Sequence, residues 1–279
     1  MIQPTSRSLD ACIGDDLNVI IRLHEKARLY DYLRKNKSLF AYHIGDLDPF
    51  FFSDCTWYGL IEDETVVDVV LVYQGMSTPT VLALGLTSSM PCLIYGILDE
   101  LPDCFYSHYR KELEPVFLSS YTMTPFGAHL KMDFRGFRSD LTVAEHHDCV
   151  QLTPRDEEQL RQLYRIAYPG HYFNPRMLAT GKYYGIKHGA AILAVAGVHV
   201  YSQAYRIAVI GNVTTHPRMR NRGFAKRCVT TLITVLDPDV DFIGLNVKAD
   251  NDPAIALYHA IGFTIASSYE EALFEKSST

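Results

Sequence analysis

The residues best suited to chemistry form a basic turn between a strand-like run, residues 207–213, and a helix-like run, residues 224–236. The turn and the helix start read Arg220, Asn221, Arg222, Gly223, Phe224, Ala225 and Lys226. Backbone N–H groups at a helix N-terminus have no partner within the helix and carry partial positive charge, so an anion is stabilised there. Gly223 lets the backbone approach that anion without a Cβ in the way. The turn is therefore predicted to bind a phosphate group.

A second segment adds a similar turn further along the chain. A strand-like run at residues 243–248 leads into Asn251 and Pro253. Pro253 suits the first turn of a helix, where its missing N–H leaves no hydrogen bond unmade. The apolar and aromatic residues that follow lie at helical spacing, and a glycine and a phenylalanine end the element: Ala254, Leu257, Tyr258, Ile261, Gly262 and Phe263. A second strand–turn–helix unit is therefore predicted.

Together the two segments resemble the coenzyme A site of the GCN5-related N-acetyltransferases (GNAT). Arg220, Gly223 and Ala225 fit that family's R-x-x-G-x-[GA] signature. The family's second pattern, N-x-x-A-x-x-x-Y-x-x-x-G-F, is matched in register by Asn251, Ala254, Tyr258, Gly262 and Phe263. The resemblance is closest to the branch with an FR47-like carboxy-terminal domain, which includes glycine N-acyltransferase-like proteins. It implies acetyl-coenzyme A (acetyl-CoA) as co-substrate, and no metal.

The resemblance also implies roles for individual residues. The cofactor-binding set would be the strand end Val213, Thr214 and Thr215, the turn residues 220–226, Asn251 and Tyr258. The backbone N–H of Val213 would stabilise the oxyanion of the tetrahedral intermediate. Tyr258 would protonate the departing thiolate as a general acid. The alternative for Tyr258 is a half-buried aromatic residue with its hydroxyl at the surface.

A general base is harder to find in the sequence. An alkyl amine with a pKa near 10.4 is almost wholly protonated at pH 7, which costs about 4 to 5 kcal/mol before attack. Many relatives carry a glutamate on the strand before the phosphate turn, but residues 207–213 hold no carboxylate. His199 and His216 are the nearby titratable groups, with suitable unperturbed pKa values near 6.5. Each could equally be an ordinary strand or turn residue, and a relayed water could serve instead.

Composition limits the classes of protein that fit. The chain has 279 residues, 48% of them hydrophobic, and a formal net charge of −6. An acidic balance argues against a general nucleic-acid binder, and the basic turn lacks the interleaved aromatic residues that stack bases. Residues 1–7 show no secretory signal, and no apolar run is long enough to span a membrane. Six scattered cysteines without a C-x-x-C pair favour reduced thiols, so we expect a cytoplasmic protein.

The predicted fold class is α/β (α+β), with two GNAT-like domains, each a mixed, mostly antiparallel twisted sheet flanked by helices. Residues 149–279 would be the acetyl-CoA-binding domain, because the strand and helix patterns there follow the family plan. Residues 1–140 would be a degenerate GNAT-like copy that shapes the acceptor site or an interface. Its expected elements are a helix, three strands and a second helix: residues 15–36, 57–61, 65–73, 80–84 and 91–101.

Two functions stay open. The first is an N-acetyltransferase that moves the acyl group of acetyl-CoA to a primary amine by direct attack in a ternary complex. The second is a non-catalytic acyl-CoA-binding sensor or scaffold. The acceptor would be a small-molecule amine or amino acid, and a protein amino terminus is also compatible; no nucleic acid or membrane partner is expected. An aromatic loop at residues 168–173 either lines the acceptor entrance or packs as a plain loop.

Overall fold

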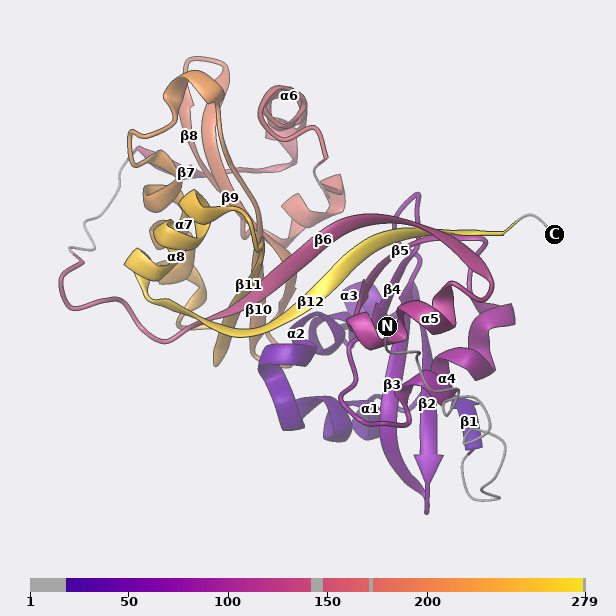
Figure 1. The fold of residues 1–279 in the computed structure, drawn as a ribbon. Coiled ribbons are helices and arrows are strands. Elements are labelled where there is room, and N and C mark those ends of the chain that lie inside the picture. Colours follow the sequence, from indigo (N-terminus) through magenta and orange to yellow (C-terminus); the bar gives the residue numbers. More distant parts are fainter. Residues whose placement is uncertain (1–18, 142–147, 171–172, 278–279) are drawn as a thin grey trace, which may run out of the picture. The chain divides into compact units, whose positions relative to one another are not determined.

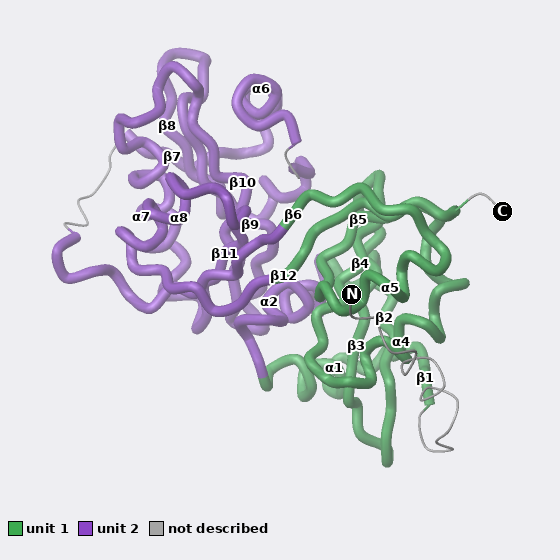
Figure 2. The backbone as a smooth tube through the Cα atoms, viewed as in Figure 1, with its two compact units in different colours: residues 1–35, 51–127, 269–279 green, residues 36–50, 128–268 purple. Residues whose placement is uncertain are grey.

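The computed structural model describes residues 19–141, 148–170 and 173–277 (Figure 1). The chain forms two compact units (Figure 2). Unit 1 comprises residues 1–35, 51–127 and 269–279, and unit 2 comprises residues 36–50 and 128–268. This division differs from a simple split between residues 140 and 149, because each unit takes a segment from the other half of the sequence.

Unit 1 is a sheet with short helices. Its elements are β1 (Val19–Arg22), α1 (Lys26–Leu33), β2 (Cys55–Glu62), β3 (Thr65–Tyr73), β4 (Thr80–Ala83), α4 (Met90–Ile97), the turn η3 (Leu98–Glu100), β5 (Cys104–Tyr109), the turn η4 (Lys111–Leu113) and α5 (Glu114–Phe117). The start of β6 (Tyr121–Phe134) and the end of β12 (Phe263–Lys276) also belong to it. The strand order is β1-β2-β3-β4-β5-β12, and only β4 and β5 among these described pairs run parallel.

Unit 2 contains the segments that carry the sequence motifs. Its elements are α2 (Lys37–Asp46), β7 (Cys149–Gln151), η5 (Pro154–Asp156), α6 (Glu157–Ala167), η6 (Pro175–Thr180), β8 (Tyr184–His188), β9 (Ala191–Ser202), β10 (Ile207–Thr215), η7 (Pro217–Met219), α7 (Phe224–Leu236), β11 (Phe242–Lys248) and α8 (Asp252–Ile261). The strand order is β12-β6-β11-β10-β9-β8-β7. Strands β10 and β11 run parallel, whereas β11 and β6 run antiparallel. The turn η2 (Arg34–Asn36) and helix α3 (Pro49–Phe52) lie at the ends of the segment that unit 2 takes from the first half.

Each unit is completed by a strand from the opposite half of the sequence. In unit 2 the end of β6 pairs with β11, from His129 opposite Lys248 to Asp133 opposite Gly244. In unit 1 the end of β12 pairs with β5, including Phe274 opposite Phe105. One ladder in each unit therefore depends on residues distant in sequence.

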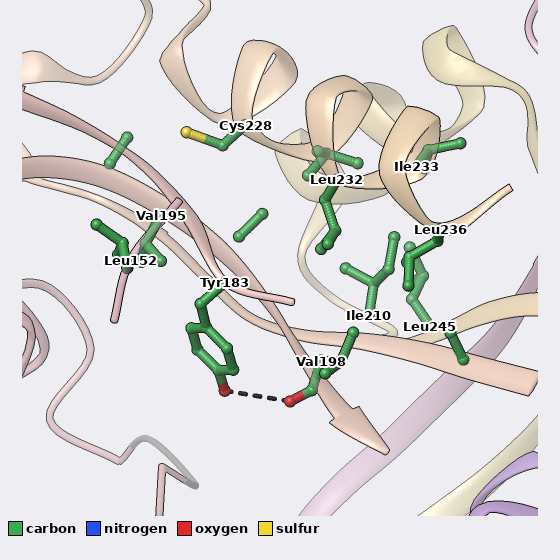
Figure 3. Close-up of a cluster of buried hydrophobic side chains, with 14 of the residues drawn as sticks. Leu152, Tyr183, Val195, Val198, Ile210, Cys228, Leu232, Ile233, Leu236 and Leu245 are labelled. Carbon is green, nitrogen blue, oxygen red and sulfur yellow. Dashed lines mark hydrogen bonds between the residues drawn. The ribbon is translucent and has the colours of Figure 1, made fainter. Parts of the chain in front are cut away.

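Helix α7 covers one face of the unit 2 sheet (Figure 3). Its apolar residues recur at helical spacing, and Leu232 and Leu236 are fully buried. They lie beside Ile210 of β10 and Leu245 of β11 (Figure 3). Burying a leucine side chain contributes about 1.5 to 3 kcal/mol, so this face fixes α7 on the parallel strand pair.

The structure confirms most of the predicted elements in unit 2. Helix α7 has the predicted bounds, and β10, β11 and α8 lie where the two motifs placed them. Three strands of unit 1, β2, β3 and β4, are also confirmed. The helix predicted at residues 15–36 is wrong in part: residues 19–22 are the edge strand β1, paired with β2, and only residues from 26 onward are helical. Three β-branched residues in a row, Val19, Ile20 and Ile21, suit a strand better than a helix. Residues 15–18 lie outside the described part.

The cysteines differ in part from the expectation of reduced thiols. Cys55, Cys104, Cys149 and Cys228 are free, whereas Cys92 is disulfide-bonded. Because disulfides are rare in the reducing cytosol, this bond does not support the expected cytoplasmic location. Within the described residues, no helix has the length and apolar character needed to cross a bilayer.

Candidate functional site

The parallel strands β10 and β11 pair over only part of their length. Their pairing runs from Ile207 opposite Phe242 to Ile210 opposite Leu245. Strand β10 then continues to Thr215, and β11 to Lys248, without further mutual pairs. Helices α7 and α8 follow these two strands, so their N-termini lie toward the same edge of the sheet. In open α/β sheets this edge, at the carboxyl ends of parallel strands, is where ligands bind.

A bulge in β10 lies directly beyond the last paired residue. Gly211 is opposite Gly197 and Thr214 opposite Val195, so Asn212 and Val213 together face a single residue of β9. Asn212 has a left-handed backbone, with φ of 54°. The bulge thus redirects the backbone at Val213, the residue predicted to supply the oxyanion-stabilising N–H.

Two tyrosines hold this bulge in place. The Tyr164 hydroxyl donates to the Asn212 carbonyl at 3.0 Å. The Asn212 side-chain amide donates to the Tyr183 hydroxyl at 3.0 Å, and that hydroxyl donates to the Val198 carbonyl at 3.1 Å. These side chains are buried, so each of these hydrogen bonds satisfies polar atoms that water does not reach. The geometry at Val213 is therefore tightly fixed.

The predicted phosphate turn has the backbone that an anion site requires. Asn221 and Gly223 both adopt left-handed conformations, with φ of 61° and 75°. Gly223 occupies the N-cap position of α7, and no side chain in the described structure caps the first turn. A Cβ placed on Gly223 would meet no atom within 4 Å, so the glycine is required by its φ and leaves open space above the turn. The first N–H groups of α7 are therefore available to a ligand.

The basic residues of the turn divide into two groups. Arg218, Arg220 and Arg222 are exposed, and Arg220 contacts the Ala167 carbonyl through its guanidinium at 3.4 Å. Arg227 instead forms an ion pair with Asp148 at 2.8 Å and packs on the Phe224 ring. The exposed arginines can therefore face an anion, whereas Arg227 has a structural role.

Helix α8 supplies the two other predicted residues. The Asn251 side chain accepts a hydrogen bond from the Ala254 N–H at 3.3 Å, so this asparagine is the N-cap of α8. Tyr258 is buried, and its ring packs on Phe263. Burial, with a smaller contribution from Tyr168, raises the pKa of Tyr258. Its phenol is therefore protonated at neutral pH, as a proton donor must be. The residue is 6% exposed, which is more buried than the half-buried alternative expected, and its role as an acid stays a prediction.

The two histidines predicted as weak base candidates lie in different settings. His216 is the N-cap of η7, and its ring accepts a hydrogen bond from the Arg218 N–H at 3.3 Å. His199 lies against Gly211, and its Nδ1 is 2.6 Å from the Tyr42 hydroxyl. Burial lowers the pKa of His199 to about 4, although the Asn212 side chain opposes the shift. His199 is therefore neutral at pH 7 and a weak base. Of the aromatic loop 168–173, residues 171 and 172 lie outside the described part.

A polar row that the sequence reasoning missed lies on the face of the sheet opposite α7. Ile210, Leu245 and Met132 face the apolar core, so their strand neighbours face the other way. These neighbours include Gly211, Asn246 and Lys131, and Lys131 lies directly opposite Asn246 in the ladder. Helix α2 packs on this face across β9, β10 and β11.

Lys131 is the most unusual member of the row. It is 2% exposed, and its Nζ lies 5.3 Å from the centre of the Tyr42 ring. Burial lowers the pKa of Lys131 to about 7, and the Asp133 carboxylate opposes the shift. No local motif marks this lysine, because its strand belongs by sequence to the half that lacks the signatures. A lysine between two apolar residues, Leu130 and Met132, was the one available indication.

The comparisons with known proteins agree with this geometry. Residues 143–263 match the acetyltransferase (GNAT) family. This stretch, the GNAT region, holds β10, the basic turn, α7, β11 and α8. A comparison with curated protein sequences gave no match. No group of three or more potential metal ligands occurs among the described residues.

Solved structures show that the fold is the GNAT fold. A GCN5-related N-acetyltransferase from Sphaerobacter thermophilus has a TM-score of 0.60 and 12% identity, over 95% of this chain and 98% of that one. A GNAT-family acetyltransferase from Colwellia psychrerythraea has a TM-score of 0.55 and 13% identity, over 92% and 100%. A tandem GNAT protein from the clavulanic acid biosynthesis pathway has a TM-score of 0.56 and 13% identity, over 94% and 99%. The α/β sheet with flanking helices predicted from the sequence is confirmed.

Proposed function

We propose that this protein is an N-acetyltransferase that transfers the acetyl group of acetyl-CoA to a primary amine by direct attack in a ternary complex. The observation that carries the proposal is the uncapped N-terminus of α7 with its left-handed, arginine-rich turn. This turn follows the point where β10 and β11 stop pairing. The match of the GNAT region supports acyl transfer in general, and the residues support the narrower reaction.

The residues present fit coenzyme A. A pyrophosphate carries negative charge that the first N–H groups of α7 and the side chains of Arg220 and Arg222 would neutralise. Lys226, one turn into α7, is half-buried and adds a further cation. An extended amide-bearing arm would bind beside β10 beyond Ile210, where β11 no longer pairs with it. The remaining predicted contacts lie at the same edge of the sheet, at the carboxyl ends of β10 and β11: Thr214, Thr215, Asn221 and Asn251.

The chain's own groups would act on the reacting atoms at two places. Bound acetyl-CoA supplies a thioester, which is an activated acyl group. The Val213 N–H, held in direction by the bulge at Asn212, would donate to the developing oxyanion. Tyr258 would hold its proton until the sulfur leaves, because burial keeps the phenol neutral.

We infer that unit 1 is a GNAT-like copy that does not bind coenzyme A. With two GNAT-like units, the chain would be a tandem protein, and we place it in the FR47-like branch. The tandem GNAT protein named above covers nearly all of this chain, which supports the inference. The acceptor would be a small-molecule amine or amino acid. A non-catalytic acyl-CoA sensor was the alternative because β10 has no carboxylate, and the buried Lys131 weakens that argument.

Calorimetry and thiol release together test the proposal. Acetyl-CoA should bind with one site per chain, and a panel of small amines, amino acids and peptide amino termini should reveal acceptor-dependent release of free thiol. Coenzyme A binding in the absence of any acceptor-dependent release would exclude the enzyme and leave the sensor. Absence of binding would show that the turn has been assigned to the wrong ligand.

A further inference from the structure

We propose that Lys131 is the general base of the reaction, so that a strand from the first half of the sequence supplies the proton acceptor for a coenzyme A site in the second half. The inference rests on the proposed function and deepens it, because β10 holds no carboxylate. Lys131 takes the place of a base that β10 lacks.

The first step of the argument is position in the sheet. Lys131 lies opposite Asn246, the first residue of β11 beyond its last pair with β10. The adjacent residue on β10 is Gly211, which precedes the Asn212–Val213 bulge. Gly211 has no side chain, and the His199 ring lies in the space above it, so Lys131, Tyr42 and His199 adjoin one another on this face of the sheet. Gly211 is two residues before Val213, whose N–H would meet the developing oxyanion.

The second step is the covering helix. Tyr42 of α2 spans the same row, with its hydroxyl 2.6 Å from His199 Nδ1 and its ring 5.3 Å from Lys131 Nζ. An aromatic face stabilises a cation, so it tolerates the ammonium that forms once Lys131 has taken a proton. The Tyr42 ring can therefore stabilise the charged form of Lys131 after the proton transfer.

The third step is charge. Asp133, two residues along β6, is the charged neighbour, and its carboxylate also accepts hydrogen bonds from Ser38 and Arg135. On α2, the Asp46 carboxyl is buried and its pKa is raised by that burial, which disfavours its charged form. His199 on β9 is neutral. Burial outweighs the opposing charge of Asp133, so the pKa of Lys131 is lowered to about 7.

A base of this strength suits the task. General base catalysis is most efficient when the pKa of the base lies near the working pH. About half of Lys131 is then neutral at pH 7 and can accept a proton, whereas His199, with a pKa of about 4, accepts one poorly. His216 is engaged as the cap of η7. Lys131 is therefore the best placed of the three groups.

Every proton that moves in the reaction can be assigned to the acceptor amine, Lys131, Tyr258 or the departing sulfur. Neutral Lys131 takes one proton from the bound ammonium of the acceptor, and the amine nitrogen then forms its bond to the thioester carbon. When the carbon–sulfur bond breaks, Tyr258 gives its proton to the sulfur, and the second proton of the new amide nitrogen restores the phenol. Lys131 returns its proton to water, so the products are an amide and a free thiol.

The test compares Lys131→Met and Lys131→Arg with Lys182→Met. Lys182 is a partly buried lysine of unit 2 that pairs with Asp239, so its loss controls for removing a lysine. Both Lys131 variants should lose about 100-fold or more in kcat. The wild-type rate should fall below pH 7 as Lys131 becomes protonated, and this fall should be absent from the pH–rate profiles of the variants. Their affinity for acetyl-CoA, measured by calorimetry, should stay within about twofold of the parent. Arginine should not rescue, because its guanidinium stays protonated.

A measurement independent of activity follows the lysine itself. In NMR spectra of protein with labelled lysine side chains, one resonance should titrate near pH 7, and it should be missing from Lys131→Met. A Lys131→Met variant that keeps kcat and the pH profile overturns the inference alone. So does a wild-type protein in which no lysine titrates below pH 9, even if the variants fail to fold. Wild-type protein that binds acetyl-CoA but acetylates no amine overturns the proposed function and this inference with it.

Discussion

Strand β10 in unit 2 and strand β4 in unit 1 have the same local setting. Each runs parallel to the next strand of its sheet, β11 or β5, and each leads through a turn into a helix, α7 or α4. In unit 2 the strand continues beyond its last parallel pair and the turn carries arginines. In unit 1, β4 pairs with β5 up to Ala83, its last residue. No unpaired strand end remains there.

The unit 1 turn also has the wrong charge for a phosphate. The Asp68 carboxylate lies against Gly85, where a Cβ would clash with its oxygen, and it accepts hydrogen bonds from Tyr32 and Thr87. A proline in the first turn of α4, Pro91, removes one of the N–H donors. A strand–turn–helix unit therefore becomes an anion site only when charge, left-handed turn residues and free strand edge occur together.

The comparison assigns the chemistry to unit 2, and Tyr258→Phe should show the largest effect. Removing the hydroxyl should lower kcat by about 10² to 10⁴ if it is a true general acid, with a much smaller change in acetyl-CoA affinity. The matched control is Tyr109→Phe in unit 1, where a buried hydroxyl bonds Glu114. Stopped-flow thiol release measures both. A similar loss in the two variants would contradict the assignment.

The turn itself is tested by Gly223→Val. A β-branched residue at φ of 75° is strained, and the altered backbone should weaken acetyl-CoA binding about 100-fold by calorimetry. Gly189→Val is the control, because Gly189 also has positive φ and open space but lies in the turn between β8 and β9. Equal affinities for the two variants would show that the turn does not hold the cofactor.

The charges of the turn should matter less than its backbone. Arg222→Ala should weaken acetyl-CoA binding about tenfold, which corresponds to about 1.4 kcal/mol, and the loss should shrink at high salt because the side chain is exposed. Arg22→Ala, which removes an exposed arginine of unit 1, should leave the affinity unchanged. If both arginines affect binding equally, the contrast in charge between the units is not what selects the ligand.

The smallest expected effect is a pH dependence in unit 1. Burial raises the pKa of Asp68 despite its hydrogen bonds with Thr87 and Tyr32. The folded state then holds a proton that the unfolded state has released, so stability falls as pH rises above the ordinary carboxyl pKa, by at most about 1.4 kcal/mol per pH unit. Asp68→Asn should flatten this fall in urea titrations between pH 4 and 7. An unchanged slope would mean that burial does not raise the pKa of Asp68.

The sequence predicted those parts of the site that depend on local pattern. The bounds of α7 follow from helical spacing after a glycine, and Asn251 marks the start of α8 as its cap. The row containing Lys131 and Tyr42 could not be predicted, because β6 and α2 reach unit 2 from the other half of the chain. Strand β1 was missed for a related reason, since its pairing with β2 outweighs the helix pattern around it.

The exchange of β6 and β12 has a consequence for how the protein is made. A ribosome synthesises the chain from its N-terminus, so β5 is made before its partner β12, which follows more than half a chain later. Until then the edge of β5 is exposed, and unpaired edges invite association with other chains. Contacts between such distant residues also slow folding, because a long loop must close first. The order of synthesis thus makes this molecule dependent on its last strand.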